Sequence, residues 1–293
     1  MKKPVHTISG IRTSYLSGLR DLYDADEINS ILYILFEDFL GWPKSKLHLE
    51  PLTALAESDS HKFYNALSLL AQSCPVQYIT GRTNFNGLTI MVNPSVLIPR
   101  PETAELAGIL VKDLGACDLK NFTAVDIGTG SGCLAIYIKK QLPAIGMHGT
   151  DISEEALLTA RANASMNETE IDFFSSDILG TGEAMPGKAY SLIVSNPPYV
   201  TMSEKEAMRK NVKEYEPSTA LFVPDQDPLL YYKAICRHAQ NGLAPNGLLY
   251  LEINEAYGNE LKQLLDSEGF GDIILLKDFR GRQRFIKAVF RNH

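Results

Sequence analysis

One tetrapeptide has the residue types and the order needed to bind a planar NH2 group: Asn196-Pro197-Pro198-Tyr199. Such a nitrogen is a poor nucleophile, because resonance delocalises its lone pair as it does in a peptide bond. The Asn196 side-chain oxygen and the Pro197 carbonyl are suited to accept its two hydrogens, since the two prolines stiffen the backbone around them. We expect the Tyr199 ring to lie against the flat group. The tetrapeptide alone fits a rigid turn with a surface tyrosine equally well.

A glycine-rich loop upstream indicates a nucleoside site. It follows a strand-like run at 122–125 and precedes a helical pattern at 134–142, and its candidate binding residues are Asp126, Gly128, Thr129, Gly130, Ser131 and Gly132. Alternate glycines let the backbone approach a ligand closely, and the N–H groups that begin the next helix favour an electron-rich partner. Cys133 replaces the third glycine of a dinucleotide site, whereas the acidic Asp126 suits the cationic sulphonium and ammonium of S-adenosylmethionine. A plain strand-to-helix turn shows the same glycines.

Two aspartates follow the next two strand-like runs and complete the predicted nucleoside site. Asp151 ends the run at 144–150, about twenty residues beyond the glycines, where an acidic side chain usually binds ribose hydroxyls. Asp177 follows the run at 171–174. It is expected to accept from the adenine amino group, with Ile178 packed on the ring. Asp151 also fits the cap region of a helix, and Asp177 also fits a plain loop.

Helices and strands alternate from Pro101 onward, which is the pattern of a doubly wound sheet in an α/β domain. Seven strands are expected, at 122–125, 144–150, 171–174, 190–195, 248–252, 272–276 and 284–290. The last two lie so close together that the final strand is expected to be antiparallel. Helices are expected at 228–240 and 256–267. Ligands of such sheets bind beyond the carboxyl ends of the strands, where the glycine loop, Asp151 and Asn196 all fall.

The N-terminal region, 1–74, is expected to form a small helical domain. After the capping candidate Asp24, an apolar face at helical spacing is formed by Ile28, Ile31, Leu32, Leu35 and Phe39. Further helices are expected at 51–57 and 61–73.

A hairpin is predicted between the helical region and the sheet. Asn86-Gly87 is the signal of a tight turn, and the second strand is expected at 89–92. We therefore expect a hairpin linker at 75–100 and the sheet domain at 101–293.

These segments, in this order, resemble those of the HemK/PrmC family, the S-adenosylmethionine-dependent glutamine N5-methyltransferases that modify peptide chain release factors. The resemblance extends from Cys74 to the C-terminus. Besides the glycine loop, Asp151 and the tetrapeptide, it rests on Pro75 to Gly81, Leu97 to Thr103, Tyr215-Glu216-Pro217 with Ala220-Leu221, and Asp278 to Arg284. The most specific stretch is Ile98-Pro99-Arg100-Pro101-Glu102-Thr103, whereas the tetrapeptide is shared with amino-methyltransferases of DNA.

The resemblance implies a class I methyltransferase fold, Rossmann-like with a seven-stranded sheet. It also implies methyl transfer from S-adenosylmethionine to the N5 amide of the glutamine in the Gly-Gly-Gln motif of release factors. The region 101–293 is then the catalytic domain, and 1–74 is the helical domain that binds the substrate protein. Asn196, Pro197 and Tyr199 are the expected catalytic residues, with Pro198 beside them and with Asn196 also touching the cofactor.

Arg100 and Ile178 each have more than one interpretation. Arg100 is expected on the substrate side of the pocket, although its stiff Pro99-Arg100-Pro101 segment equally fits an anchor for the next helix. Ile178 stands where the family often has an aromatic residue. We expect it to cover the adenine by apolar contact, with weaker or differently shaped cofactor binding.

The charge distribution bears on the substrate. A net charge of -7 opposes a grip on duplex DNA, which needs clustered Lys and Arg. Arg280, Arg282 and Arg284 alternate along a predicted strand, and they fit either a small phosphate patch or a solvated, protected sheet edge. A DNA adenine N6-methyltransferase is the alternative, since it shares the pocket, but no target-recognition region is evident. A nucleoside-binding protein without catalysis is disfavoured, because the tetrapeptide would then have no function.

Composition predicts a cytoplasmic enzyme. The N-terminal segment has no apolar signal core, and the longest apolar run, 31–36, is too short for a membrane span. The four cysteines have no paired spacing and the six histidines are scattered, so neither disulfides nor a metal site is expected. Cys133 is interpreted as a small buried residue. The expected partners are release factors, without DNA or membrane, and the oligomeric state is left open.

Overall fold

The computed structural model describes residues 6–180 and 189–291. Contacts divide the chain into two compact units, Met1–Gly81 with Arg209–Tyr215 and Arg82–Met208 with Glu216–His293. The first unit therefore extends past the predicted boundary at 74, and it includes a short segment from far along the sequence.

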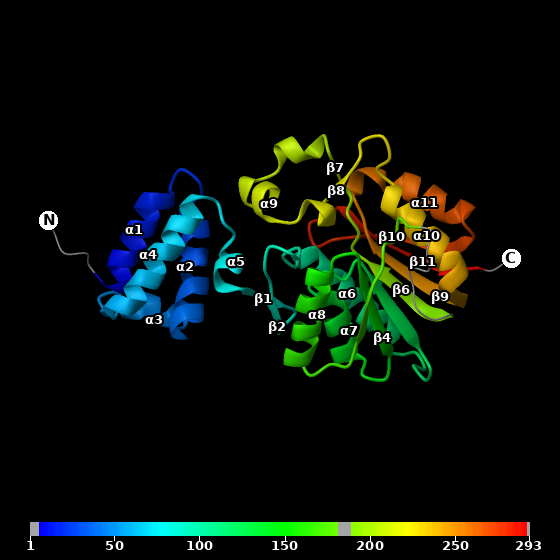
Figure 1. Cartoon of the computed structure of the whole chain (residues 1–293), viewed down its shortest axis with the longest axis horizontal. Coiled ribbons are helices and arrows are strands. Elements are labelled where there is room, and N and C mark those ends of the chain that lie inside the picture. Colours follow the sequence, from blue (N-terminus) through cyan, green and yellow to red (C-terminus); the bar gives the residue numbers. More distant parts are fainter. Residues whose placement is uncertain (1–5, 181–188, 292–293) are drawn as a thin grey trace. The chain divides into compact units, whose positions relative to one another are not determined.

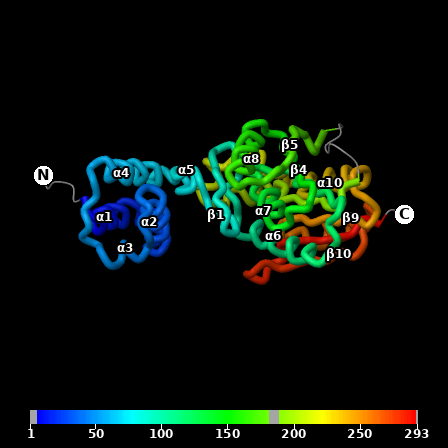
Figure 2. Tube along the Cα trace, turned by 90° about the horizontal axis from the view of Figure 1, so that it is seen from below, coloured from blue at the N-terminus to red at the C-terminus, as the bar shows by residue number. Residues whose placement is uncertain are grey.

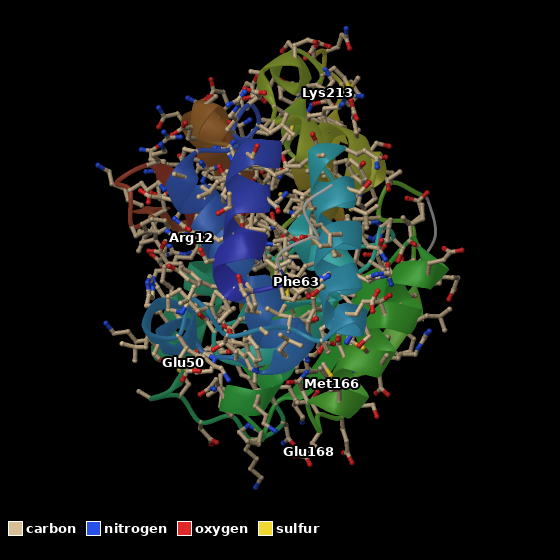
Figure 3. All side chains as sticks on the ribbon, turned by 90° about the vertical axis from the view of Figure 1, so that its left-hand side faces the viewer. Arg12, Glu50, Phe63, Met166, Glu168 and Lys213 are labelled. Carbon is tan, nitrogen blue, oxygen red and sulfur yellow. The ribbon has the colours of Figure 1, made fainter. Side chains whose placement is uncertain are left out.

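The first unit is a helical bundle. Its helices are α1 (Ile8–Leu19), α2 (Ala25–Leu40), α3 (Lys44–Leu49), α4 (Glu57–Ala71), α5 (Val76–Thr80) and α9 (Lys210–Tyr215). The Asp24 side chain accepts the Glu27 N–H at 2.8 Å, which confirms the predicted cap of α2. Phe63 of α4 points between the helices (Figure 3), with its ring centroid 4.3 Å from that of Phe36.

The predicted helix at 51–57 is wrong. Residues 51–52 form a turn, and the backbone at 53–55 pairs with residues just before and at the start of α1, where Leu55 N donates to the His6 carbonyl at 2.6 Å and Ile8 N donates to the Thr53 carbonyl at 3.1 Å. Backbone groups used in this pairing are not available for helical bonds. The helical turn lies earlier, in α3, and α4 begins at Glu57.

Helix α9 packs into the first unit through side-chain contacts. The Tyr215 hydroxyl donates to the Gln72 carbonyl at 2.9 Å, and Arg209 forms an ion pair with Glu27 at 2.7 Å. The segment that follows the tetrapeptide in sequence thus completes the helical bundle.

The second unit is built on a seven-stranded sheet of order β10-β11-β9-β6-β3-β4-β5. Its strands are β3 (Thr123–Ile127), β4 (Gly146–Asp151), β5 (Asp172–Ser175), β6 (Tyr190–Ser195), β9 (Leu243–Glu252), β10 (Phe270–Lys277) and β11 (Gln283–Phe290). Strand β11 is antiparallel to both neighbours, and β9, β6, β3, β4 and β5 run parallel. The predicted sheet and its antiparallel last strand are confirmed.

Helices cover both faces of this sheet (Figure 1). In one layer, α7 (Cys133–Gln141) contacts both α6 (Pro101–Leu114) and α8 (Glu154–Met166). Helices α10 (Leu230–Gly242) and α11 (Gly258–Ser267) form the other, over a core of buried apolar side chains. The doubly wound α/β architecture is therefore confirmed.

The predicted hairpin is present as β1 (Arg82–Phe85) and β2 (Leu88–Met91). Its turn residues Asn86 and Gly87 both have positive φ, 48° and 88°, as an Asn-Gly turn requires. Strand β2 lies beside α8 (Figure 2), where Met91 N donates to Asn163 Oδ1 at 2.7 Å and the Asn163 amide donates back to the Met91 carbonyl at 2.9 Å. These bonds make the hairpin part of the second unit.

Short elements surround the carboxyl edge of the sheet. Strand β7 (Val200–Thr201) pairs in parallel with β8 (Phe222–Val223), and 3₁₀ turns lie at Glu204–Ala207, Ser218–Ala220 and Glu255–Tyr257. Among residues 6–180 and 189–291, none of the helices has the length and apolarity to traverse a bilayer.

Candidate active site

The parallel strands β3, β4 and β6 end at one edge of the sheet, where Ile127 pairs with Thr150 on one side and with Ser195 on the other. The residues that follow these strands therefore converge. They line a cavity of about 270 Å³. The predicted site residues on its wall are Arg100, Asp126, Gly128, Thr129, Gly130, Ser131, Asp151, Asp177, Ile178, Asn196, Pro197 and Pro198. Gly132 and Tyr199 are not among its lining residues.

The glycine loop is shaped by backbone conformations that favour glycine. Gly130 has φ +55° and donates its N–H to Asp151 Oδ2 at 2.9 Å, which ties the loop to the end of β4. Gly132 has φ +78°, and a Cβ there would lie 3.1 Å from the Ala160 Cβ. Glycine at this position thus permits the close approach of α7 and α8 and the tight entry into α7.

Asp126 is buried at the bottom of the loop and accepts the Thr129 hydroxyl at 2.7 Å. Burial raises its pKa to about 7, opposed by the Thr129 bond and reinforced by the charge of Asp151. In the described residues no lysine or arginine pairs with it. Asp126 therefore offers a buried carboxylate that a cationic ligand group would stabilise in its charged form.

Asp151 is held by backbone donors. Its Oδ2 accepts from Gly130 and its Oδ1 accepts from Ser153 N at 3.0 Å. Burial raises the pKa of Asp151, and these bonds oppose the shift. The Ile152 N–H also lowers the Asp151 pKa. A carboxylate has about four acceptor sites, so the group keeps acceptor capacity for ligand hydroxyls.

Asp177 and Ile178 lie on the far wall of the cavity. Asp177 Oδ1 accepts Leu179 N at 2.9 Å in a local turn. Ile178 packs against the main core, and its carbonyl is 3.1 Å from His238 Nε2. Tyr231, at the start of α10, also lines the cavity, so an aromatic ring is present among its lining residues.

Asn196 has one side of its carboxamide fixed by the protein. Its Nδ2 donates to Thr103 Oγ1 at 3.0 Å, and the Thr103 hydroxyl donates to Glu252 Oε2 at 2.7 Å. In the described residues no group donates to Asn196 Oδ1 or to the Pro197 carbonyl. The tetrapeptide therefore holds two acceptors without protein partners at the cavity.

Tyr199 is anchored on the same carboxylate. Its hydroxyl donates to Glu252 Oε1 at 2.9 Å, and the side chain packs partly buried against the core. Burial and the nearby Glu252 charge raise the pKa of Tyr199 well above its usual range. Tyr199 thus supports the tetrapeptide from behind, and its expected contact with a flat substrate group stays a prediction.

Arg100 is part of a buried anchor. It pairs with Glu216 Oε1 at 2.6 Å, and Glu216 Oε2 accepts Ile98 N at 3.1 Å. The Glu216 side chain is only 1% exposed. This pair fixes the segment before α6 and sets the Arg100 guanidinium at the cavity wall, and binding of substrate by Arg100 stays a prediction.

Two family models match the chain. One is described as the methyltransferase small domain and matches residues 106–214, and the other is the PrmC N-terminal domain and matches residues 17–81. The release factor glutamine methyltransferase of Flavobacterium psychrophilum is 42% identical over 97% of this chain and 99% of that protein. The protein of the same name from Bacteroides thetaiotaomicron is 38% identical over 94% and 98%.

The chain belongs to the release factor glutamine methyltransferase family. It is therefore an enzyme that transfers methyl groups, as the resemblance predicted. A solved structure with a similar fold is the hMettl16 catalytic domain in complex with a 3′UTR hairpin, with a TM-score of 0.52 and 17% identity, covering 78% of this chain and 82% of that chain. That likeness concerns the fold alone.

Sequence reasoning missed three side chains of this methyltransferase site. Thr103 was noted only within a family segment, Glu252 only as the end of a strand, and Tyr231 not at all. A carboxylate ending a buried strand at the ligand-binding edge was the available signal for Glu252. For Tyr231 no sequence signal was present, because its place on the wall depends on how α10 packs.

The described residues show no further candidate chemistry in the cavity. Among them no three His, Cys, Asp or Glu side chains gather as a metal site would require. Cys133 lines the cavity but is buried, and burial raises its thiol pKa to about 12. The thiol is thus uncharged at neutral pH, in line with its interpretation as a small buried residue.

Proposed function

We propose that this enzyme transfers a methyl group from S-adenosylmethionine to the N5 amide nitrogen of the glutamine in the Gly-Gly-Gln motif of peptide chain release factors. The observation that carries the proposal is the pair of acceptors at the cavity, Asn196 Oδ1 and the Pro197 carbonyl, next to the glycine loop. A relative that is 42% identical over 97% of the chain carries the name release factor glutamine methyltransferase, which supports the proposal.

The cavity residues fit the proposed cofactor. Buried Asp126 is without a cationic partner in the described residues and suits the ammonium and sulphonium charges. Asp151 retains acceptor capacity for ribose hydroxyls, and Ile178 with Tyr231 offers apolar and aromatic surface for an adenine ring. When bound, S-adenosylmethionine supplies the electrophilic methyl group.

The two acceptors have a direct chemical task. An amide nitrogen gains positive charge as its lone pair is committed to a new bond, because resonance with the carbonyl is lost. Asn196 Oδ1 and the Pro197 carbonyl accept its two hydrogens and stabilise that charge as it develops. They also orient the amide, which is the main demand of an in-line transfer. The surplus proton leaves the nitrogen after the transfer, so no general base is assigned.

We also propose that the helical unit binds the release factor. It has its own buried core and matches the PrmC N-terminal domain over residues 17–81. Addition of release factor to isotope-labelled enzyme should shift backbone amide resonances within 6–81 as well as those around the cavity. Shifts confined to the cavity would contradict this role.

The deciding experiment measures transfer of labelled methyl from S-adenosylmethionine to purified release factor. A release factor with Gln→Ala in its Gly-Gly-Gln loop and a duplex DNA are tested beside it. Label on the intact release factor alone is the expected result. Label on DNA alone would overturn the proposal in favour of an amino-methyltransferase of DNA.

A further inference from the structure

Glu252, the carboxylate that binds Thr103 and Tyr199, costs free energy to bury. Glu252 ends β9 and is 1% exposed. In the described residues no cation lies within ion-pair distance of it, and Arg284 of β11 acts on it only from farther away. Burying a carboxylate without a close counter-ion is costly unless hydrogen bonds satisfy it. Its acceptors are used by the Thr103 and Tyr199 hydroxyls, so its burial serves these two groups.

The hydrogen bonds have one consistent direction. Burial raises the pKa of Glu252, and the hydrogen bonds from Thr103 and Tyr199 and the charge of Arg284 oppose that shift. In its ionised form the carboxylate only accepts, which agrees with the Thr103 hydroxyl donating to Glu252 Oε2. The Thr103 oxygen then has only lone pairs to offer, and its neighbour must donate to it. Asn196 therefore turns its NH2 group to Thr103 and its Oδ1 to the opposite side.

We propose that Glu252 and Thr103 are positioning residues that fix the orientation of the Asn196 carboxamide, so that an acceptor and not a donor faces the substrate amide. The inference rests on the proposed function and deepens it. A carboxamide turned by half a rotation would set its own NH2 against the substrate NH2. Two donors facing each other repel, and the amide would lose one of its two acceptors.

At the other end of the tetrapeptide, Tyr199 is held by a hydrogen bond to the same carboxylate. Glu252 accepts Tyr199 directly and Asn196 through Thr103, so one carboxylate fastens both ends of the segment. The prolines between them limit backbone freedom. Loss of Glu252 should therefore loosen the whole segment, whereas loss of the Thr103 hydroxyl should free only the Asn196 amide.

The first test compares Thr103→Val with Thr103→Ser. Valine keeps the shape and removes the hydroxyl, and we expect kcat for the release factor to fall by about tenfold or more, as for loss of a hydrogen bond to a charged group. The dissociation constant of S-adenosylmethionine should stay within about twofold, because the contacts of the glycine loop are untouched. Serine keeps the hydroxyl and should retain most of the wild-type kcat.

A matched control is available in α8. Thr159 is also buried, and its Oγ1 accepts the Asn93 Nδ2 at 3.0 Å, yet it does not line the cavity. Thr159→Val should lower the unfolding temperature about as much as Thr103→Val does and leave kcat unchanged. If kcat fell equally in both valine variants, the loss would be explained by lower stability alone, and the inference would be overturned.

A double-mutant cycle tests whether Glu252 acts through Thr103. Glu252→Gln replaces one of the two acceptor oxygens with a donor and should lower kcat by itself. Its effect should be much smaller when Thr103 is already valine, because the orienting path is then broken. Fully additive losses would show that Glu252 acts independently of Thr103.

A spectroscopic measurement decides the orientation without any substrate. The Asn196 side-chain amide protons should exchange slowly with solvent in the wild-type enzyme and faster in Thr103→Val, whereas Thr103→Ser should restore protection. Identical exchange in all three would overturn the inference. If instead the orientation is confirmed but wild-type enzyme labels no release factor, the proposed function fails and the positioning of Asn196 stands.

Discussion

The two halves of the cavity are built in different ways. In the cofactor half, paired residues are near in sequence: Thr129 and Asp126 are 3 residues apart, and Gly130 and Asp151 are 21 apart. In the amide half, Asn196 and Thr103 are separated by 93 residues, and Thr103 and Glu252 by 149. The first half is a local strand-loop-helix unit, whereas the second exists only when the whole sheet has formed.

This difference predicts separable effects. Substitutions in the cofactor half should change the affinity for S-adenosylmethionine, and substitutions in the amide half should change turnover. The largest effect is expected for Asn196→Ala, which removes an acceptor that stabilises developing charge. We expect kcat to fall by about 10² to 10³, the usual loss for such a group. Single-turnover kinetics with the release factor would measure it.

The control for this variant is Asn241→Ala. Asn241 is an exposed amide on α10 whose side chain donates only to its own helix. It should leave both kcat and cofactor affinity unchanged. The distinction between the two halves would fail if Asn196→Ala kept a near-normal single-turnover rate. It would also fail if the cofactor affinity fell by as large a factor as the rate.

The next largest effect is expected for Asp151→Asn in the cofactor half. The amide lacks the charge that strengthens bonds to ligand hydroxyls, and its NH2 group would oppose either the Gly130 N–H or the Ser153 N–H with a donor. The dissociation constant of S-adenosylmethionine should rise by about 10-fold to 100-fold. Calorimetric titration would measure it, with the exposed Asp172→Asn on β5 as a control that should bind normally.

At saturating cofactor, Asp151→Asn should recover most of the wild-type kcat. That recovery is the sharpest sign that the cofactor half contributes binding and the amide half contributes chemistry. A variant that binds normally but turns over slowly would instead place Asp151 in the amide half.

The local half was also the one that the sequence predicted well. The glycine loop, Asp151 and the order of strands follow from short patterns, because hydrophobic periodicity and glycine positions act within one strand-loop-helix unit. The distant pairs leave no such pattern. Nothing near Glu252 indicates Thr103, and nothing near Arg100 indicates Glu216, 116 residues away.

The error in the helical unit has the same origin. Residues 51–57 have acceptable helical composition, but the backbone at 53–55 pairs with the chain beside His6 and Ile8. Such pairing between segments separated in sequence overrides local propensity. The same holds for α9, which joins the first unit although it follows the tetrapeptide in sequence.

An effect of intermediate size is expected when the pH is changed, because burial raises the pKa of Asp126 to about 7. Both the stability and the cofactor affinity should depend on this titration. In the unliganded enzyme this acid favours its protonated form, so its contribution to stability is present below the unfolded pKa of 3.8 and is lost as pH rises through about 7. Cation binding has the opposite sign, because it favours the carboxylate. Affinity for S-adenosylmethionine should rise by about tenfold between about pH 6 and pH 8.

Asp126→Asn provides the comparison for this titration. It should flatten the rise of cofactor affinity with pH and remove the fall in unfolding free energy between acidic and neutral pH. Calorimetric titration and thermal unfolding at several pH values would measure the two quantities. An unchanged pH profile in Asp126→Asn would assign the titration to another group.

The smallest effect is expected for Ile178→Ala. Ile178 and Tyr231 both line the cavity, and Ile178 is partly buried against the core. Truncation removes apolar contact worth about 0.8 kcal/mol per buried methylene, so the cofactor dissociation constant should rise by about threefold to tenfold. Met202→Ala, exposed and outside the cavity, is the control. An unchanged dissociation constant would show that Ile178 does not contact the adenine. Tyr231 of α10 would then be the side chain that packs on the adenine, and it would take the place of the aromatic residue that the family often has at position 178.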